Sequence, residues 1–158
     1  MKNENKIFEP DEFVSVALPL INDGLAVPLR VSGGSMEPYL AGGRDTVYIT
    51  KPTFPLKKGD IAFFSRSAGK IVMHRIYRVK ANEYFFIGDG QTVIEGPIFE
   101  SQIFGVVKDV HRKGKNEKRN SFTPWFFRHI WINLIPLRPF LLKVYRCTLG
   151  KIKKKKRL

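Results

Sequence analysis

The feature that most restricts the fold is a series of short apolar segments separated by turn-forming residues. The segments are rich in β-branched and aromatic residues, and Gly, Pro, Asn and Asp stand between them. They cover residues 25–31, 46–50, 61–64, 70–80, 84–87 and 103–110. Segments of this length and composition are typical of strands. The sequence therefore predicts a mostly β domain, a twisted sheet or barrel-like arrangement, that ends near Val110.

Two further regions flank these segments. A short N-terminal helix is predicted over residues 10–22, because Pro10 and Asp11 suit a helix start and Asn-Asp-Gly follows the last apolar residues. Residues 111–121 are almost wholly polar, which predicts a solvated linker. The expected division is a β domain with its helix over residues 1–110, this linker, and a basic, aromatic helical tail.

The tail covers residues 122–158, and Pro136 and Pro139 divide it into two predicted helices. Its charge sets it apart. The chain has a formal net charge of +14, but residues 1–107 hold 12 basic and 12 acidic side chains, whereas residues 108–158 hold 16 basic and 2 acidic ones. All of the excess positive charge therefore lies in the last third of the chain, which points to an anionic partner for that region.

Three interpretations of the tail are open. Aromatic residues mixed with Arg and Lys suit a helix lying on an anionic membrane surface. The same charge would bind nucleic acid, and the helices could also simply pack on the β domain. The cluster of Trp125, Phe126, Phe127 and Trp131 favours apolar burial over phosphate contact. The sequence thus predicts peripheral membrane binding, with nucleic acid as the less favoured partner.

Residues 31–40 (VSGGSMEPYL) contain the strongest candidate for chemistry. A catalytic serine needs a constrained turn, a nearby base and converging backbone N–H groups, because its hydroxyl is a poor nucleophile at neutral pH. Gly33 and Gly34 allow the positive φ angles of such a turn before Ser35, and Pro38 fixes the direction in which the chain leaves it. A Gly-Gly-Ser turn is also common as a hairpin corner or linker, so the motif needs a partner.

The candidate base is His74, inside the predicted strand 70–80. The chain has three histidines, and the other two, His111 and His129, lie in the predicted linker and tail. A neutral imidazole can accept a serine proton at pH 7. Strand alternation places His74 on the same face as residues 72 and 76, so an ordinary half-buried core histidine is the alternative interpretation.

Five short motifs occur in a characteristic order between Val31 and Val107. They are Gly33, Ser35, Met36, Pro38 and Leu40; Gly59-Asp60-Ile61; His74-Arg75; Gly88-Asp89-Gly90; and Gly105-Val106-Val107. In order and spacing they resemble the serine peptidase superfamily of type I signal peptidases and LexA-like repressors. The resemblance implies a mostly β peptidase domain. A histidine at position 74 resembles the histidine type of signal peptidase, in which a serine–histidine pair replaces serine–lysine.

The resemblance also bears on the rest of the site. Its register places the acid that orients the imidazole at Glu95, six residues after Asp89, where the family has aspartate. Asp89 could instead take that role or cap its own turn. Signal peptidases supply an oxyanion-hole hydroxyl at the position of Gly33, so here we expect a hole built from backbone N–H groups, that of Ser35 included. Met36 either touches substrate or fills a gap in the core.

The sequence thus predicts a serine endopeptidase that hydrolyses a peptide or protein substrate through an acyl-enzyme. The resemblance implies a preference for small residues before the scissile bond. Neither a cofactor nor a metal is expected, and the single Cys147 excludes an intramolecular disulfide. Because no apolar run is long enough to span a membrane, we expect a cytoplasmic protein at the inner membrane face. The competing hypothesis is a non-catalytic protein of this fold that binds anionic membrane or nucleic acid through its tail.

Overall fold

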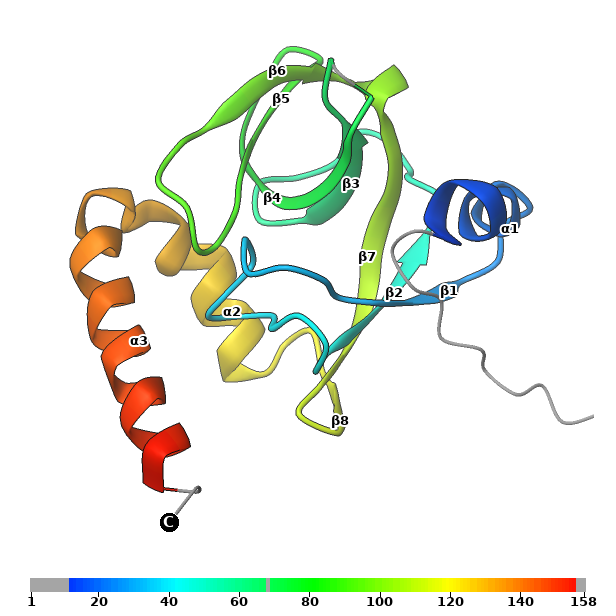
Figure 1. The fold of residues 1–158 in the computed structure, drawn as a ribbon. Helices are drawn as coiled ribbons and strands as arrows, with labels where there is room; N and C mark the ends of the chain where they lie inside the picture. Colours follow the sequence, from blue (N-terminus) through cyan, green and yellow to red (C-terminus); the bar gives the residue numbers. More distant parts are fainter. Residues whose placement is uncertain (1–11, 68, 156–158) are drawn as a thin grey trace, which may run out of the picture.

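The computed structural model describes residues 12–67 and 69–155 (Figure 1). Within them the protein is mostly β, with eight strands in one sheet and three α-helices. A π-helical turn, Phe13–Ala17, continues directly as the first helix. The elements are α1 (Leu18–Asn22), β1 (Val27–Arg30), β2 (Thr46–Thr50), β3 (Ile61–Ser65), β4 (Ile71–Lys80), β5 (Glu83–Ile87), β6 (Glu95–Phe99), β7 (Ile103–Arg112), β8 (Lys115–Glu117), α2 (Phe122–His129) and α3 (Arg138–Lys155).

All strand pairs of the sheet are antiparallel, in the order β1-β2-β7-β3-β4-β5-β6, with β8 paired to β7. The long strand β7 joins the two halves of the sheet, because it pairs with β2 near one end and with β3 near the other. The described strands leave β1 and β6 as the two ends of the path, so they form a twisted sheet and not a closed barrel (Figure 1).

The predicted strands are confirmed, with small shifts at their ends, and the short N-terminal helix is confirmed over its described part. Its predicted start at Pro10 and Asp11 lies outside the described residues. The polar linker predicted over residues 111–121 is wrong in its first half. There β7 continues to Arg112, and a turn at Lys113 and Gly114 leads into β8. Antiparallel pairing supplies the backbone hydrogen bonds of this hairpin, so its side chains can remain polar.

The apolar core consists of two clusters that are built from different strands. One lies among α1, β1 and β2, and it includes Ile21, Leu40 and Ile49. The second lies among β3, β4, β5 and β6, with Phe64 and Phe86 stacked at 4.3 Å between ring centroids. The two clusters make the sheet a rigid support for the loops at its edges.

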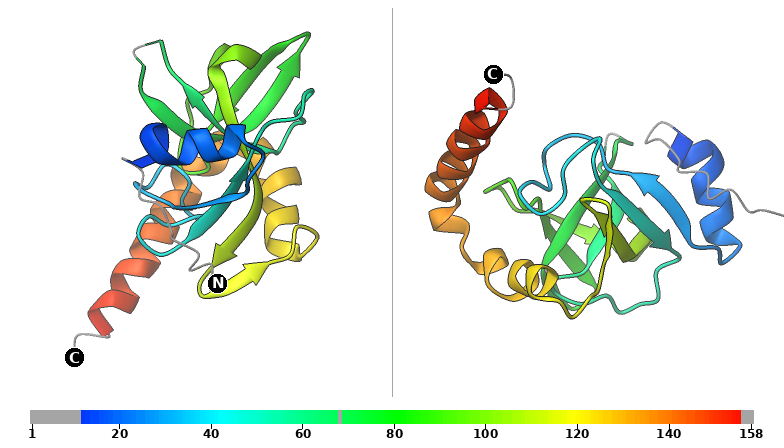
Figure 2. Two further views of the ribbon diagram at one scale, coloured as in Figure 1. Left: turned by 90° about the vertical axis from the view of Figure 1, so that its right-hand side faces the viewer. Right: turned by 90° about the horizontal axis from the view of Figure 1, so that it is seen from below.

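The tail belongs to the first cluster. Phe127, Trp131 and Leu142 are 6–7% exposed and belong to this cluster, in which the Phe127 ring lies 4.9 Å from that of Tyr39, between β1 and β2 in the chain. The expected division into a β domain and a separate tail is therefore replaced by one shared core. The break at the prolines is confirmed, since α2 and α3 are separated by two short 3₁₀ turns. Figures 1 and 2 show α1 on one side of the sheet and the tail helices on the opposite side.

Among the described residues, no helix has an apolar stretch long enough to cross a bilayer.

Candidate active site

The predicted nucleophile Ser35 lies in a tight turn between β1 and β2. Ser35 is half-buried, whereas Ser32, Gly33 and Gly34 are exposed. The Glu37 N–H donates to the Gly34 carbonyl oxygen at 3.1 Å, which closes the turn. Gly33 has a φ of 68°, a conformation that most side chains avoid, but Gly34 is not in the positive-φ region. The conformation expected for both glycines is therefore confirmed at Gly33 and wrong at Gly34.

The Ser35 turn packs against the Gly-Asp-Gly loop that follows β5. The Gly90 N–H donates to the Ser35 carbonyl oxygen at 2.8 Å. A Cβ atom on Gly88 would lie 2.5 Å from the same oxygen, and one on Gly90 would lie 2.8 Å from the Glu37 carbonyl oxygen. Because Cβ atoms do not approach backbone oxygens so closely, this contact requires glycine on both sides of Asp89. The contact explains why a second glycine motif accompanies the serine motif.

The candidate base His74 lies in β4 and is only 1% exposed. The ladder between β4 and β5 pairs Arg75 with Ile87. One residue further along this antiparallel ladder, His74 comes level with Gly88. Since Gly88 packs against the Ser35 backbone, the fold brings the imidazole strand and the serine turn to the same end of β5.

The two nitrogens of the His74 ring have different surroundings. Nδ1 is fully buried and faces Glu95. Nε2 makes no hydrogen bond with the described residues. It is not fully buried, so it retains a small contact with solvent. No hydrogen bond joins the Ser35 hydroxyl to the ring within the same residues. Catalytic hydrogen bonds are often long until substrate binds, and Nε2 is the nitrogen left to accept a proton.

The carboxylate in contact with His74 is that of Glu95, the first residue of β6. Its Oε1 atom lies 2.9 Å from His74 Nδ1, within hydrogen-bond distance but without the geometry of a hydrogen bond. Arg66 holds the same carboxylate, with Nε donating to Oε2 at 2.5 Å and Nη2 donating to Oε1 at 2.7 Å. A two-point arginine contact of this kind fixes the plane of the carboxylate beside the imidazole.

The charge states follow from these surroundings. Burial lowers the pKa of His74 below its usual value, although the charge of Glu95 raises it in part. Burial raises the pKa of Glu95, but the hydrogen bonds from Arg66 and the nearby His74 outweigh burial and leave that pKa below its usual value. At neutral pH the imidazole is therefore uncharged and the carboxylate is ionised. These are the states that a histidine base and its orienting acid require.

Asp89, the other carboxylate that the sequence offered, belongs to a different contact. It forms a buried ion pair with Arg75, whose Nε and Nη2 atoms donate to its two oxygens at 2.8 and 2.6 Å. Arg75 also donates to the Gly59 carbonyl oxygen at 3.1 Å. Asp89 is therefore placed neither as the partner of the imidazole nor as a cap of its own turn. Arg75, the residue after His74 in β4, is therefore the charge-pair partner of Asp89.

The remaining predicted site residues divide between the turn and the core. The Ser35 N–H, expected as the oxyanion donor, makes no hydrogen bond within the described chain and is available to a substrate oxygen. Met36 is 2% exposed and belongs to the first core cluster, so of its two expected roles it fills the core. Pro38 is half-buried, and it does not line the cleft described next.

An apolar cleft of about 350 Å³ opens beside the serine turn. It lies between residues 29–32, which lead into the turn, and residues 69–73, which lead into His74. Its apolar lining includes Leu29, Val31, Val47, Phe63, Ile71 and Met73. Sequence reasoning missed this cleft, because the lining comes from four strands that only the sheet order brings together.

Both walls of the cleft have unpaired backbone. In the described sheet β1 is an end strand, paired only with β2. Residues 71–73 pair with β3 on one side, while β5 begins its pairing with β4 only at Arg75. Free strand edges beside an apolar cleft are the arrangement that binds an extended peptide by adding it as a further strand.

Arg66 is a candidate functional residue that sequence reasoning missed. It lies just after β3, in the hairpin to β4, and 29 positions separate it from Glu95. No local pattern in the sequence relates two residues so far apart. The signal that could have indicated the pair is the ordinary need of a half-buried carboxylate for a cationic partner.

The described residues contain no cluster of His, Cys, Asp and Glu side chains that could hold a metal ion. Comparison with protein-family models finds no match, and no curated protein gives a significant match.

Proposed function

We propose that this protein is a serine endopeptidase of the signal peptidase and LexA-like superfamily. Ser35 is the nucleophile, His74 the general base and Glu95 the carboxylate that orients the base. The observation that carries the proposal is the 2.9 Å contact between Glu95 Oε1 and His74 Nδ1. The Gly88 loop packs against the Ser35 backbone, and His74 comes level with Gly88 in the ladder, which supports assigning the three residues to one site.

The reaction follows from the roles of the three side chains. Ser35 Oγ attacks the peptide carbonyl carbon, and its proton passes to His74 Nε2. The Ser35 N–H stabilises the oxyanion, and the ionised Glu95 stabilises the imidazolium that forms. The C–N bond then breaks as Nε2 returns the proton to the leaving amine. Water, activated by the same imidazole, attacks the acyl-enzyme and releases the second product.

The cleft suits an extended peptide substrate. Its apolar floor binds side chains on one face of the peptide, and the free edges of β1 and residues 71–73 bind its backbone. The cleft lining includes Ser32, three residues before Ser35, so a peptide bound there could extend toward the nucleophile. The preference for small residues before the scissile bond is carried over from the resemblance.

The placement of the remaining motifs supports the superfamily. Gly105 and Val106 lie in β7 opposite β3, with Ala62 paired to Val106. A Cβ atom on Gly105 would lie 2.4 Å from Ile49 Cγ2, so β2 and α1 can pack over this point only if it is glycine. The glycine of the Gly105-Val106-Val107 motif therefore has a packing reason within the sheet.

A second proposal concerns the tail. Phe122, Trp125 and Phe140 are 74%, 44% and 68% exposed, and exposed Lys143 and Arg146 lie on the same helix as Phe140. Exposed aromatic rings beside cationic groups favour an anionic membrane surface, because rings settle at headgroup depth and the charges attract the lipid. A nucleic-acid duplex would engage the charges and leave the rings without a partner, because its bases are already stacked on one another. A protein without catalysis that binds membranes in this way is the alternative.

The test of the peptidase proposal is covalent labelling with a fluorophosphonate probe, which reacts with activated serines. We expect the label to map to Ser35 by peptide mass spectrometry. His74→Gln should slow labelling by about 10³-fold or more, since it removes the base. Ser32→Ala is the matched control, because it removes an exposed hydroxyl three residues away and should label normally. The proposal would be refuted if the folded protein is not labelled, or if His74→Gln is labelled as fast as the wild type.

A further inference from the structure

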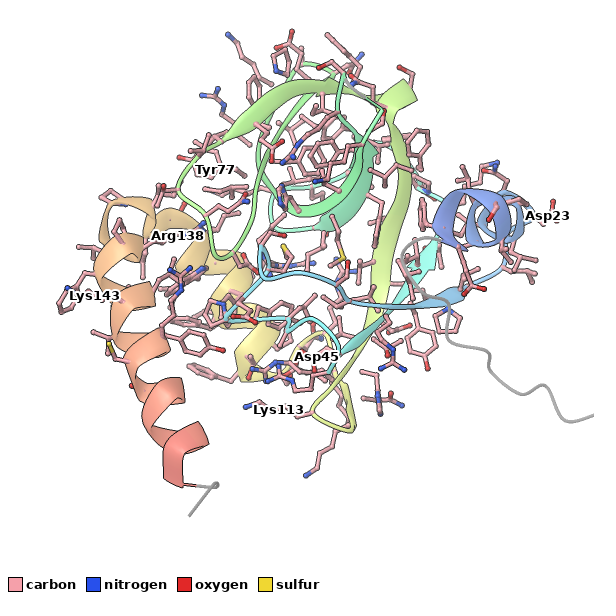
Figure 3. All side chains as sticks on the ribbon, in the orientation of Figure 1. Asp23, Asp45, Tyr77, Lys113, Arg138 and Lys143 are labelled. Atoms are coloured by element: carbon pink, nitrogen blue, oxygen red, sulfur yellow. The ribbon has the colours of Figure 1, made fainter. Side chains whose placement is uncertain are left out.

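The first residue of α3, Arg138, extends into the sheet domain and reaches the loop behind the serine turn. Its side chain is 0% exposed. Its Nη1 atom donates to the carbonyl oxygens of Gly88 and Gln91 at 2.9 and 2.7 Å, and Nη2 donates to that of Trp131 at 3.2 Å. In Figure 3 Arg138 lies at the end of α3 nearest the sheet, whereas Lys143 points away from it. The tail therefore contacts the loop against which the Ser35 turn packs.

Trp131 makes a second contact with the same loop. Its Nε1–H donates to the Asp89 carbonyl oxygen at 2.8 Å. Three of the four carbonyl oxygens in residues 88–91 thus accept hydrogen bonds from the tail. The Gly90 N–H, which lies between them, is the group that donates to Ser35. The same loop leads on to Glu95, so it connects the backbone of the nucleophile with the acid.

The burial of Arg138 depends on the shape of this loop. A guanidinium without a carboxylate of its own is costly to bury, and burial lowers its pKa. Asp89 is the nearby carboxylate, but its two oxygens already accept hydrogen bonds from Arg75. Carbonyl oxygens offset the cost only while residues 88–91 keep their present conformation. The interaction is reciprocal, so the arginine must also hold the loop in that conformation.

We propose that Arg138 is a positioning residue of the peptidase site, which sets the 88–91 loop so that Ser35 and Glu95 stand correctly on either side of His74. This inference rests on the proposed function. It gives the tail a role in catalysis that is separate from membrane binding.

The first test does not depend on activity. Hydrogen exchange of backbone amides measures how firmly the loop is held. Arg138→Ala should speed exchange at Gly90 and Gln91 by about tenfold or more, and leave the amides of β2 and β7 unchanged. Arg128→Ala is the matched control, since Arg128 is a half-buried arginine of the same tail whose Nη2 donates to Asp60 at 3.0 Å. Unchanged exchange at residues 90 and 91 would overturn the inference.

The second test measures catalysis with the fluorophosphonate probe and a peptide substrate. A displacement of about 1 Å at a catalytic group costs roughly a hundredfold in rate, so Arg138→Ala should lower kcat by about that factor with little change in KM. Low-millimolar guanidinium, which can occupy the vacated site, should restore part of the loss in Arg138→Ala. It should do nothing for Arg128→Ala.

The pH profile separates positioning from general damage. The charges facing His74 are those of Glu95, Arg66 and Asp89, and Glu95 raises the pKa of the imidazole most. If the loop loosens, Glu95 moves away and this pKa falls. The acid limb of kcat/KM should therefore move to lower pH in Arg138→Ala. A uniform loss of activity with an unmoved limb would mean a structural role only.

A milder variant covers the case in which Arg138→Ala does not fold. Trp131→Phe keeps an apolar ring and removes one hydrogen bond to the loop. It should raise exchange at residue 90 and lower kcat several-fold, in a protein that melts cooperatively. If the wild type is not labelled, the proposed function fails, and the exchange result still shows whether Arg138 holds the 88–91 loop. If the wild type is labelled and both variants match it, the positioning role fails alone.

Discussion

At the scale of single residues, the site depends on two carboxylates with different partners. Glu95 contacts the imidazole and Asp89 forms an ion pair with Arg75, although only six positions separate the two acids. The sequence and the resemblance narrowed the choice to these two. Choosing between them requires the direction of each side chain. The direction of Glu95 depends on β6, and that of Asp89 depends on the buried Arg75. The sequence did not predict β6, because its first residues, Glu-Gly-Pro, resemble a turn.

Glu95→Gln should separate catalysis from stability. The amide removes the negative charge that stabilises the imidazolium, so we expect kcat to fall by about 10²–10⁴-fold. The same charge raises the pKa of His74 against the effect of burial. Its loss lowers that pKa further, so the acid limb of the kcat/KM profile should move to lower pH. Because burial lowers the pKa of His74, we expect this limb in the wild type below the usual histidine value of about 6.5. Steady-state kinetics from acid to neutral pH would measure both effects.

Asp89→Ala is the contrasting variant. It leaves the buried Arg75 without its carboxylate, which should lower the free energy of unfolding by about 3–5 kcal/mol in denaturant titrations. Glu95→Gln should change the unfolding free energy far less, because this carboxylate is partly exposed. The assignment would be contradicted if Glu95→Gln retained full activity at neutral pH while Asp89→Asn lost it without loss of stability.

At the scale of elements, the periodicity of the sequence was sufficient for the strands that build the core. The strand predicted over residues 46–50 matches β2 exactly in extent, and residues 70–80 differ from β4 by one position. The two strands that the sequence did not predict, β6 and β8, both lie at the periphery of the sheet. An end strand accepts proline and polar residues because one of its edges needs no partner. Their sequences therefore lack the pattern of a buried strand.

The cleft between β1 and the start of β4 gives a prediction at this scale. Ile71→Trp should fill part of the apolar floor and lower kcat/KM for a peptide substrate by about tenfold or more. Labelling by a small fluorophosphonate should stay near the wild-type rate, because that probe does not need the cleft. Lys70→Trp, which adds the same ring at an exposed neighbouring position outside the lining, is the control. Equal losses for the peptide and for the small probe would mean that the site itself is disturbed.

At the scale of the whole molecule, the charge division in the sequence correctly separated a neutral region from a basic one, but it did not correspond to a structural division. The charge pattern does not show which uncharged residues are buried, and Phe127, Trp131 and Leu142 of the basic region lie in the first core cluster. The sequence could not show which aromatic residues of the tail are buried, because the helices meet a surface formed by distant strands. Phe122, Trp125 and Phe140 are the ones left exposed.

Membrane binding is tested by these exposed residues and not by deleting the tail, which would also open the core. Phe122→Ser, Trp125→Ser and Phe140→Ser should each weaken partition onto anionic vesicles by about tenfold, from the loss of apolar burial. Salt should weaken binding of the wild type as well. Leu25→Ser, at an exposed apolar position outside the tail, is the control. If all three variants partition like the wild type in a vesicle-flotation assay, the membrane proposal is wrong.

The most direct test of the central claim is a crystal structure of the protein after reaction with a fluorophosphonate. We predict a covalent bond from Ser35 Oγ to phosphorus, with His74 Nε2 about 2.6–3.2 Å from Oγ and the Ser35 N–H donating to the phosphoryl oxygen. Glu95 should keep its contact with Nδ1. A phosphorylated Ser35 whose Oγ is beyond hydrogen-bond reach of the imidazole would contradict the account, and so would an adduct on any other residue.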